Sequence, residues 1–255
     1  MAIHQLTYLF DYKRINSLEQ FIKDNVKDKV VADCGSGSGI ITWLALKYGA
    51  SKVYCIEKDK DALLHLQAFL YGNNNDVEIC NIDYTKDKLP KADIYIHDLF
   101  DTHILTADLY GFILNCKKQN ITEIYPKNIV IHQGTFHKES ETFTPNRTMF
   151  DLLAESRVFF KIVSSIYPQL DTCEMPVFDN ITDISNDEII FKGDLFELID
   201  FKFNFSEQQN LWWKAYFDDS NYIDSLNHVQ NRCNVGIQKT KDFKSNLRSL
   251  LKSQP

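Results

Sequence analysis

Apolar residues along the first half of the chain gather into short runs, separated by segments with helical spacing. Runs that suit buried strands occur at residues 30–33, 52–56, 77–80, 92–97 and 128–132. Helical spacing predicts helices around 18–22 and over 40–46, 59–71 and 107–118. Strands that alternate with helices predict a doubly wound parallel sheet with right-handed crossovers, the Rossmann-like α/β class.

The pattern changes beyond residue 135. Runs typical of β-strands follow one another at 157–163, 188–191, 195–203 and 235–237, and a single helix is expected at 146–155. A polar stretch from His137 to Thr142 marks the border. The sequence therefore predicts a Rossmann-like domain over residues 1–135, and a smaller, mainly β region over residues 136–255 that serves substrate binding or oligomerisation.

A glycine-rich turn follows the first predicted strand, where Asp33 precedes Gly35, Gly37 and Gly39. Glycines let the backbone turn tightly and let a ligand approach the N-terminus of the next helix. Glu57 ends the second predicted strand, and an acidic side chain at that position accepts hydrogen bonds from both hydroxyls of a ribose. These residues together predict a cofactor that contains a nucleoside.

The acidic residue before the glycines narrows the choice of cofactor. In the dinucleotide fingerprint the helix end receives a pyrophosphate, which the carboxylate of Asp33 would repel. A carboxylate there instead receives the ammonium group of an amino-acid moiety. The combination resembles motif I of class I S-adenosylmethionine (SAM) methyltransferases, which implies SAM as the cofactor. Asp83, just after the third predicted strand, is the candidate acceptor for the adenine amino group.

Composition and charge exclude several other classes of function. The net charge of −7 argues against a nucleic-acid partner, which requires a basic surface. The six cysteines are scattered without a C-x-x-C pair, so buried free thiols are expected and no metal site is predicted. The N-terminus does not resemble a signal peptide, and no apolar run has membrane length, so a cytoplasmic protein is expected.

Four segments resemble the protein arginine methyltransferases. Residues 11–14, D-Y-K-R, match that family's D-x-x-R, whose arginine pairs with the SAM carboxylate, so the resemblance implies this role for Arg14. Residues 27–35 resemble its lead-in and motif I, and residues 48–57 resemble its G-A-x-x-V-x-A-x-E segment. Asp98 begins a segment after the fourth strand, where the family's acidic substrate loop begins. The mainly β region corresponds to the barrel that this family adds.

Two departures from that family concern the substrate. The family's loop carries two glutamates that clamp a guanidinium, whereas here the first position is Asp98 and the second falls on Ala107, with Asp108 next. The family's Thr-His-Trp loop is missing, and His228 lies in the corresponding region among non-matching neighbours. The chain beyond His228 is too short for a full barrel, so an incomplete barrel is expected.

The remaining carboxylates suit a nitrogen nucleophile, because they hold a cation and accept the proton that leaves as the nitrogen attacks. Asp98, Asp101 and Asp108 are the candidate carboxylates, and His228 is a candidate catalytic or orienting residue. The sequence predicts a SAM-dependent methyltransferase for a guanidino or amino group of a small molecule or peptide. The alternatives are a protein arginine N-methyltransferase and a catalytically silent partner protein of the same fold.

A group of aromatic residues stands out in the second region: Trp212, Trp213, Tyr216 and Phe217. Such groups most often belong to a core or to a partner surface. A core position, a homodimer surface and a wall of the substrate site all stay open.

Overall fold

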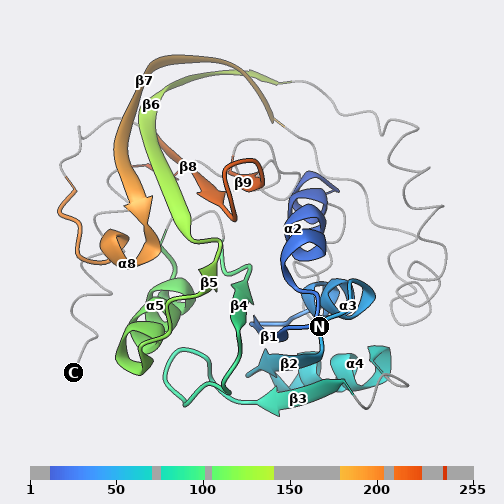
Figure 1. The fold of residues 1–255 in the computed structure, drawn as a ribbon. Helices are drawn as coiled ribbons and strands as arrows, with labels where there is room; N and C mark the ends of the chain where they lie inside the picture. The colour runs from blue at the N-terminus through green and yellow to red at the C-terminus, as the bar shows by residue number, and fades with distance from the viewer. Residues whose placement is uncertain are drawn as a thin grey trace.

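The structure is a computed structural model, and it describes residues 12–70, 76–100, 105–140, 179–203, 210–225 and 238–239 (Figure 1). The elements of the first part are α2 (Tyr12–Asn25), β1 (Val30–Cys34), α3 (Ile40–Lys47), β2 (Lys52–Glu57), α4 (Lys60–Phe69), β3 (Val77–Asn81), β4 (Ile94–His97), α5 (Ala107–Gln119) and β5 (Ile124–Tyr125). Those of the second part are β6 (Asn128–Ser140), β7 (Asp179–Asp194), α8 (Leu195–Leu198), β8 (Asn210–Tyr216), β9 (Tyr222–Asp224) and β10 (Gln238–Lys239).

The first sheet is parallel, with the strand order β3-β2-β1-β4-β5. β1 lies between β2 and β4, so the chain winds outward from it in both directions and the order reverses there. This confirms the predicted Rossmann-like sheet. The predicted helices at 40–46, 59–71 and 107–118 correspond to α3, α4 and α5. The side chains of Asp59 and Thr106 cap the N-termini of α4 and α5, which explains where these two helices begin.

The second sheet is antiparallel, with the order β10-β8-β6-β7 and with β9 beside β8. The long strands β6 and β7 arch above the parallel sheet (Figure 1). The predicted strand at 188–191 lies inside β7. The expectation of a smaller, mainly β region is therefore confirmed for the residues that the structure describes.

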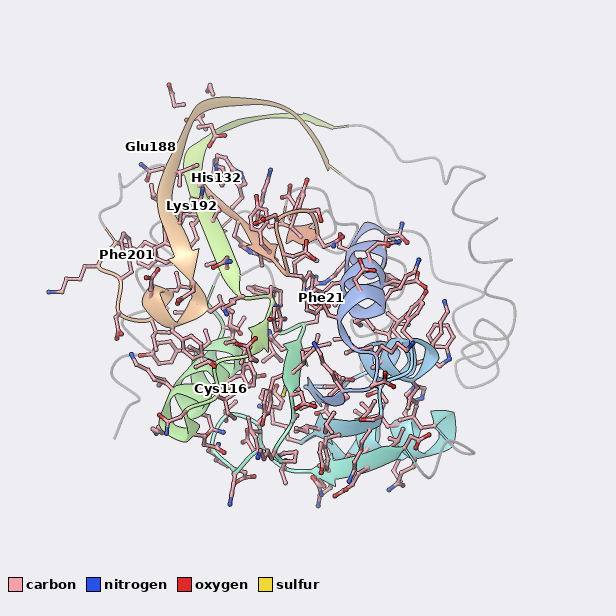
Figure 2. The ribbon with its side chains drawn as sticks, viewed as in Figure 1. Phe21, Cys116, His132, Glu188, Lys192 and Phe201 are labelled. Atoms are coloured by element: carbon pink, nitrogen blue, oxygen red, sulfur yellow. The ribbon has the colours of Figure 1, made fainter. Side chains whose placement is uncertain are left out.

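The main hydrophobic core of the described residues runs through both sheets. It joins Val31 and Ile96 of the parallel sheet to Ile131 and Trp213 of the antiparallel sheet. Phe21 of α2 lies where the two sheets meet (Figure 2), with its ring centroid 4.7 Å from that of Tyr125. The antiparallel strands are thereby packed against the edge of the α/β sheet rather than held on a separate core.

The aromatic group at 212–217 is largely interior. Trp212, Trp213 and Phe217 are buried, and Trp213 and Phe217 belong to the common core. The cysteines Cys34, Cys55 and Cys116 are buried free thiols, and Cys80 is half-buried. Cys173 and Cys233 lie outside the described residues.

The prediction that residues 128–132 form the fifth parallel strand was wrong. These residues begin β6, which pairs antiparallel with β7 and β8. The fifth parallel strand is the two-residue β5, and Pro126 follows it directly. Proline has no N–H to continue a ladder, so the chain leaves the parallel sheet at this point and starts a new strand in the second sheet.

The prediction of a strand over residues 195–203 was also wrong. Residues 195–198 form the short helix α8, whose start is fixed by a capping box. The Asp194 carboxylate accepts a hydrogen bond from the N–H of Glu197, and the Glu197 carboxylate accepts one from the N–H of Asp194. These reciprocal bonds prevail over the strand preference of the apolar residues.

The structure leaves some of the predicted elements and the predicted domain border untested. The predicted helix at 146–155 and the predicted strands at 157–163 and 235–237 lie outside the described residues. The domain border at residue 135 stays a prediction, and the antiparallel sheet already begins at Asn128. Among the residues that the structure describes, no helix is both long enough and apolar enough to cross a membrane.

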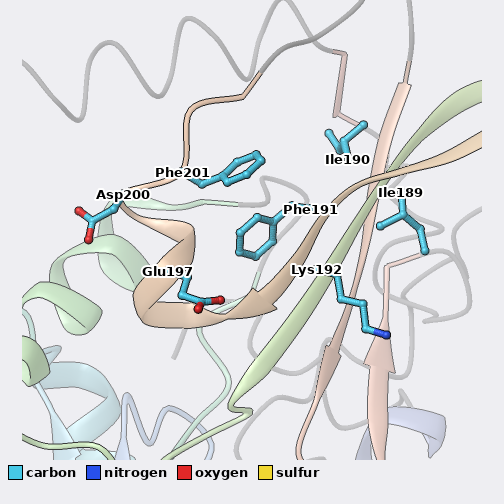
Figure 3. A pocket seen from close by; sticks show the side chains of 7 residues that line it. All are labelled: Ile189, Ile190, Phe191, Lys192, Glu197, Asp200 and Phe201. Carbon is cyan, nitrogen blue, oxygen red and sulfur yellow. The ribbon is translucent and has the colours of Figure 1, made fainter.

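A pocket of about 690 Å³ lies on the outer side of β7 and α8 (Figure 3). The residues that line it are Ile189, Ile190, Phe191, Lys192, Glu197, Asp200 and Phe201. The rings of Phe191 and Phe201 pack edge to face, with centroids 4.8 Å apart. This pocket contains none of the candidate site residues from the sequence.

Candidate functional site

The candidate residues gather at the carboxyl edge of the parallel sheet. The strand register places Cys34 of β1 beside Ile56 of β2 and beside His97 of β4. The residues that directly follow these three are Gly35, Glu57 and Asp98, so they share one edge. Ligands of open α/β sheets bind at this edge, at the point where the strand order reverses.

The glycine turn has a backbone that other residues adopt with difficulty. Gly35, Gly37 and Gly39 all have positive φ angles, of 79°, 49° and 82°. A Cβ at Gly35 would also lie only 2.7 Å from Cδ2 of Leu99. The positive φ angles therefore favour glycine at all three positions, and the close approach of Leu99 adds a steric requirement at Gly35.

Asp33 lies beneath this turn and is fully buried. Its Oδ2 accepts hydrogen bonds from the backbone N–H and the hydroxyl of Thr42, at 3.1 and 2.7 Å. Oδ1 is buried and has no hydrogen-bond partner among the described residues. Burial raises the pKa of Asp33 to about 7, since it disfavours the charged form. An unpartnered buried oxygen is an acceptor that a ligand donor would satisfy.

Glu57 links the end of β2 to the glycine turn. Its Oε2 accepts a hydrogen bond from Gly37 N at 2.9 Å, and Oε1 accepts from the N–H groups of Lys58 and Asp59 at 2.8 and 2.9 Å. These bonds fix the carboxylate at the sheet edge. A carboxylate has roughly four acceptor positions, so capacity for a ligand hydroxyl remains.

Arg14 and Asp98 form an ion pair that joins α2 to the loop after β4. Nε of Arg14 donates to both carboxylate oxygens of Asp98, at 2.9 and 2.7 Å, and Nη2 also contacts Oδ1. Nη2 further donates to the carbonyl oxygen of Phe100 at 3.2 Å. The side chain of Arg14 is 1% exposed and that of Asp98 is 16% exposed. The sequence assigned these residues to cofactor and substrate respectively, and did not predict their contact.

Asp83 and Tyr84 follow β3 at the same edge. The Asp83 carboxylate accepts from the N–H and the hydroxyl of Thr85, at 3.0 and 2.6 Å, and so stabilises its own turn. The ring of Tyr84 is buried close to Gly35. A role of Asp83 toward adenine stays a prediction.

Asp108 lies in the first turn of α5, and Lys58 reaches it from the end of β2. Lys58 Nζ donates to Asp108 Oδ1 at 2.5 Å. The same Nζ lies 5.0 Å from the ring centroid of Tyr84. Asp108 therefore has a cationic partner within the chain, which the sequence did not predict. Asp101 and His228, the other two candidates, lie outside the described residues.

The second sheet reaches the site through aromatic residues. The ring centroid of Phe100 lies 4.8 Å from that of Trp213 on β8, and 5.4 Å from that of His97. His97 is fully buried, and burial lowers its pKa to about 3, so this imidazole is neutral at ordinary pH. These contacts support the loop that carries Asp98. No local sequence pattern marks them, because they join distant elements.

Comparisons with known proteins find a family profile and curated relatives that each match about half of the chain. The profile of the ribosomal protein L11 methyltransferase (PrmA) family matches residues 12–134. Histone-arginine methyltransferase CARMER of Drosophila mojavensis is 30% identical over 144 residues, which cover 53% of this chain and 26% of that protein. The chain thus matches about a quarter of the length of this curated relative.

Two solved structures share the fold. Protein arginine methyltransferase 10 of Arabidopsis thaliana has a TM-score of 0.61 at 18% identity, and the match covers 94% of this chain and 82% of that one. The PRMT1 enzyme-prozyme heterotetrameric complex of Trypanosoma brucei with AdoHcy has a TM-score of 0.58 at 18% identity, covering 86% and 75%. At this identity the likeness describes the fold.

Proposed function

We propose that the chain is a SAM-dependent methyltransferase that methylates a guanidino or amino nitrogen, because residues 12–134 match a methyltransferase family profile and the chain is similar to arginine methyltransferases. The observation that carries the proposal is the glycine turn at the switch point, with Asp33 beneath it and Glu57 bound to it. We assign this cofactor domain to residues 1–135 and substrate binding or oligomerisation to residues 136–255.

The residues at the sheet edge fit the groups of SAM. The buried Oδ1 of Asp33 still offers an acceptor for a donor such as an ammonium group. Glu57 would accept from the ribose hydroxyls, and Arg14 would pair with the cofactor carboxylate. The full set of proposed cofactor residues is Arg14, Asp33, Gly35, Gly37, Gly39, Glu57 and Asp83.

SAM supplies an activated methyl group on a sulfonium, so the protein contributes mainly alignment, worth up to about 7–11 kcal/mol. Asp98, which is 16% exposed, is the described carboxylate best placed to hold a cationic nitrogen. It would orient the nitrogen and accept the proton released as the new N–C bond forms. Asp101, Asp108 and His228 are further candidates for this work.

The substrate we propose is a small molecule or peptide with a guanidino or amino group. A single aspartate at the first loop position, with Ala107 at the second, makes a smaller cation site than a pair of glutamates would. Protein arginine is the second candidate, supported by the similarity to a histone-arginine methyltransferase.

Calorimetric titration with S-adenosylhomocysteine (SAH) tests the cofactor. We expect saturable binding, and no binding at millimolar ligand by folded protein would overturn the proposal. Incubation with labelled SAM then tests the substrate, using arginine-like metabolites, peptides and cell lysate separately. Label in free metabolites or peptides supports a small substrate, whereas label in macromolecules alone favours protein arginine. SAH binding without any transfer of label favours a catalytically silent partner protein.

A further inference from the structure

The ion pair between Arg14 and Asp98 joins a proposed cofactor residue to a proposed substrate residue. We propose that the cofactor carboxylate competes with Asp98 for the Arg14 guanidinium, so that cofactor binding releases Asp98 to hold the cationic substrate. This inference rests on the proposed function, because it requires the cofactor at the glycine turn and a cationic substrate at Asp98.

The burial of the two partners differs in a way that suits this exchange. Arg14 is 1% exposed, and removing one partner of a buried ion pair without replacement is strongly destabilising. Arg14 is therefore expected to exchange one carboxylate for another, while its guanidinium keeps its contact with the Phe100 carbonyl. Asp98 is 16% exposed, so it is the partner that solvent and a substrate reach.

The exchange would change the net charge that a cationic substrate meets at Asp98. While Arg14 pairs with Asp98, the two charges cancel and attract a cation weakly. A second carboxylate on Arg14 leaves one net negative charge at the pair, and Asp98 then attracts a guanidinium or ammonium group. Coupling of this kind is reciprocal, so a cationic substrate should also strengthen the binding of the cofactor.

The loop after β4 brings the two subsites into contact. Asp98 and the Phe100 carbonyl both bind Arg14, whereas Leu99 between them packs onto the glycine turn at Gly35. One short segment therefore touches the ion pair and the glycine turn at once. A shift of Asp98 toward the substrate takes place beside the bound cofactor.

Calorimetry with SAH on wild-type protein and on Asp98→Asn tests the competition. We expect the variant to bind SAH about tenfold more tightly, within the range usual for coupling between sites, because the competing charge is gone. The matched control is Asp200→Asn, which removes an exposed aspartate paired with Lys117 on α5, remote from the edge. The control should bind SAH as the wild type does.

A measurement on wild-type protein covers the case in which Asp98→Asn does not fold. SAH affinity is measured with added methylguanidine, and in parallel with methylurea, its neutral analogue. We expect methylguanidine alone to tighten SAH binding. Unchanged or weaker SAH binding by folded Asp98→Asn, or an equal effect of both additives, would overturn the exchange. Absence of SAH binding by the wild type would instead overturn the proposed function.

Discussion

Lys58 and Asp108 form an ion pair across the carboxyl edge of the parallel sheet, with Nζ 2.5 Å from Oδ1. Lys58 follows β2, whereas Asp108 lies in the first turn of α5. The pair passes over the ring of Tyr84, which itself lies near Gly35. Asp108 thus differs from Asp98 in both its partner and its exposure, and the two aspartates should contribute differently to turnover.

Asp98→Asn should lower kcat/KM by about 10²–10⁴-fold, because it removes the proposed holding group and proton acceptor. Asp108→Asn should lower kcat/KM less than about fivefold, since Lys58 already neutralises that carboxylate and exposed pairs contribute about 0–1 kcal/mol. Steady-state kinetics with a guanidino substrate measures both effects. Normal turnover by Asp98→Asn would show that the substrate loop is wrongly assigned, and an equal loss in both variants would make Asp108 a second clamp.

Glu57→Ala should weaken SAH binding by roughly ten- to a hundredfold, because hydrogen bonds to a charged group contribute about 1.5–3 kcal/mol. The control is Glu78→Ala on the neighbouring strand β3, where the exposed Glu78 pairs with Lys52. Isothermal titration calorimetry compares the two variants, with thermal melting to confirm that each is folded. Similar affinities for the two variants would exclude Glu57 from the cofactor site.

Comparing Gly35→Ala with Gly49→Ala should distinguish the effect of backbone strain from the effect of a steric clash on SAH binding. Both glycines have positive φ, of 79° and 83°, so each substitution should cost about 1–2 kcal/mol of stability. Only Gly35→Ala places a Cβ 2.7 Å from Leu99, whereas the nearest neighbour at Gly49 is 3.8 Å away. We expect only Gly35→Ala to lose SAH binding. An intact SAH affinity in folded Gly35→Ala would argue against a cofactor site at the glycine turn.

The stability of the ligand-free protein should depend on the ionisation of Asp33. Burial raises its pKa from 3.8 to about 7, so the folded state binds more protons than the unfolded state between these values. The Asp33 contribution to stability should therefore fall as the pH rises from about 4 to about 7. Denaturant unfolding across this range should show the fall in wild-type protein, and Asp33→Asn should lack it.

The ionisation of Asp33 should also make SAH binding depend on pH. The ionised carboxylate is the form that receives an ammonium group, so SAH affinity should rise as the pH passes through about 7. Calorimetry between about pH 6 and pH 8 should show this rise in wild-type protein and not in Asp33→Asn. A flat wild-type profile would argue against contact between Asp33 and the amino group.

The local pattern of the sequence determined the parallel part of the fold. Apolar runs before Gly35 and before Glu57 predicted β1 and β2, and the glycines predicted the turn that follows β1. The helices α4 and α5 were also predicted, although their capping residues were not singled out. These features depend on residues that are neighbours along the chain, so a sequence pattern contains them.

Only the tertiary structure decided how the strands and charges are paired. An apolar run suits a parallel or an antiparallel strand equally, so the start of β6 was placed in the wrong sheet. Arg14 and Asp98 are 84 residues apart, and Lys58 and Asp108 are 50 residues apart. Periodicity reports which face of an element is apolar, but it does not report which charged side chains meet when distant elements pack. The sequence by itself therefore determined the cofactor turn and the strands that carry it, whereas the ion pairs beside that turn exist only because folding brings four separate segments to one edge.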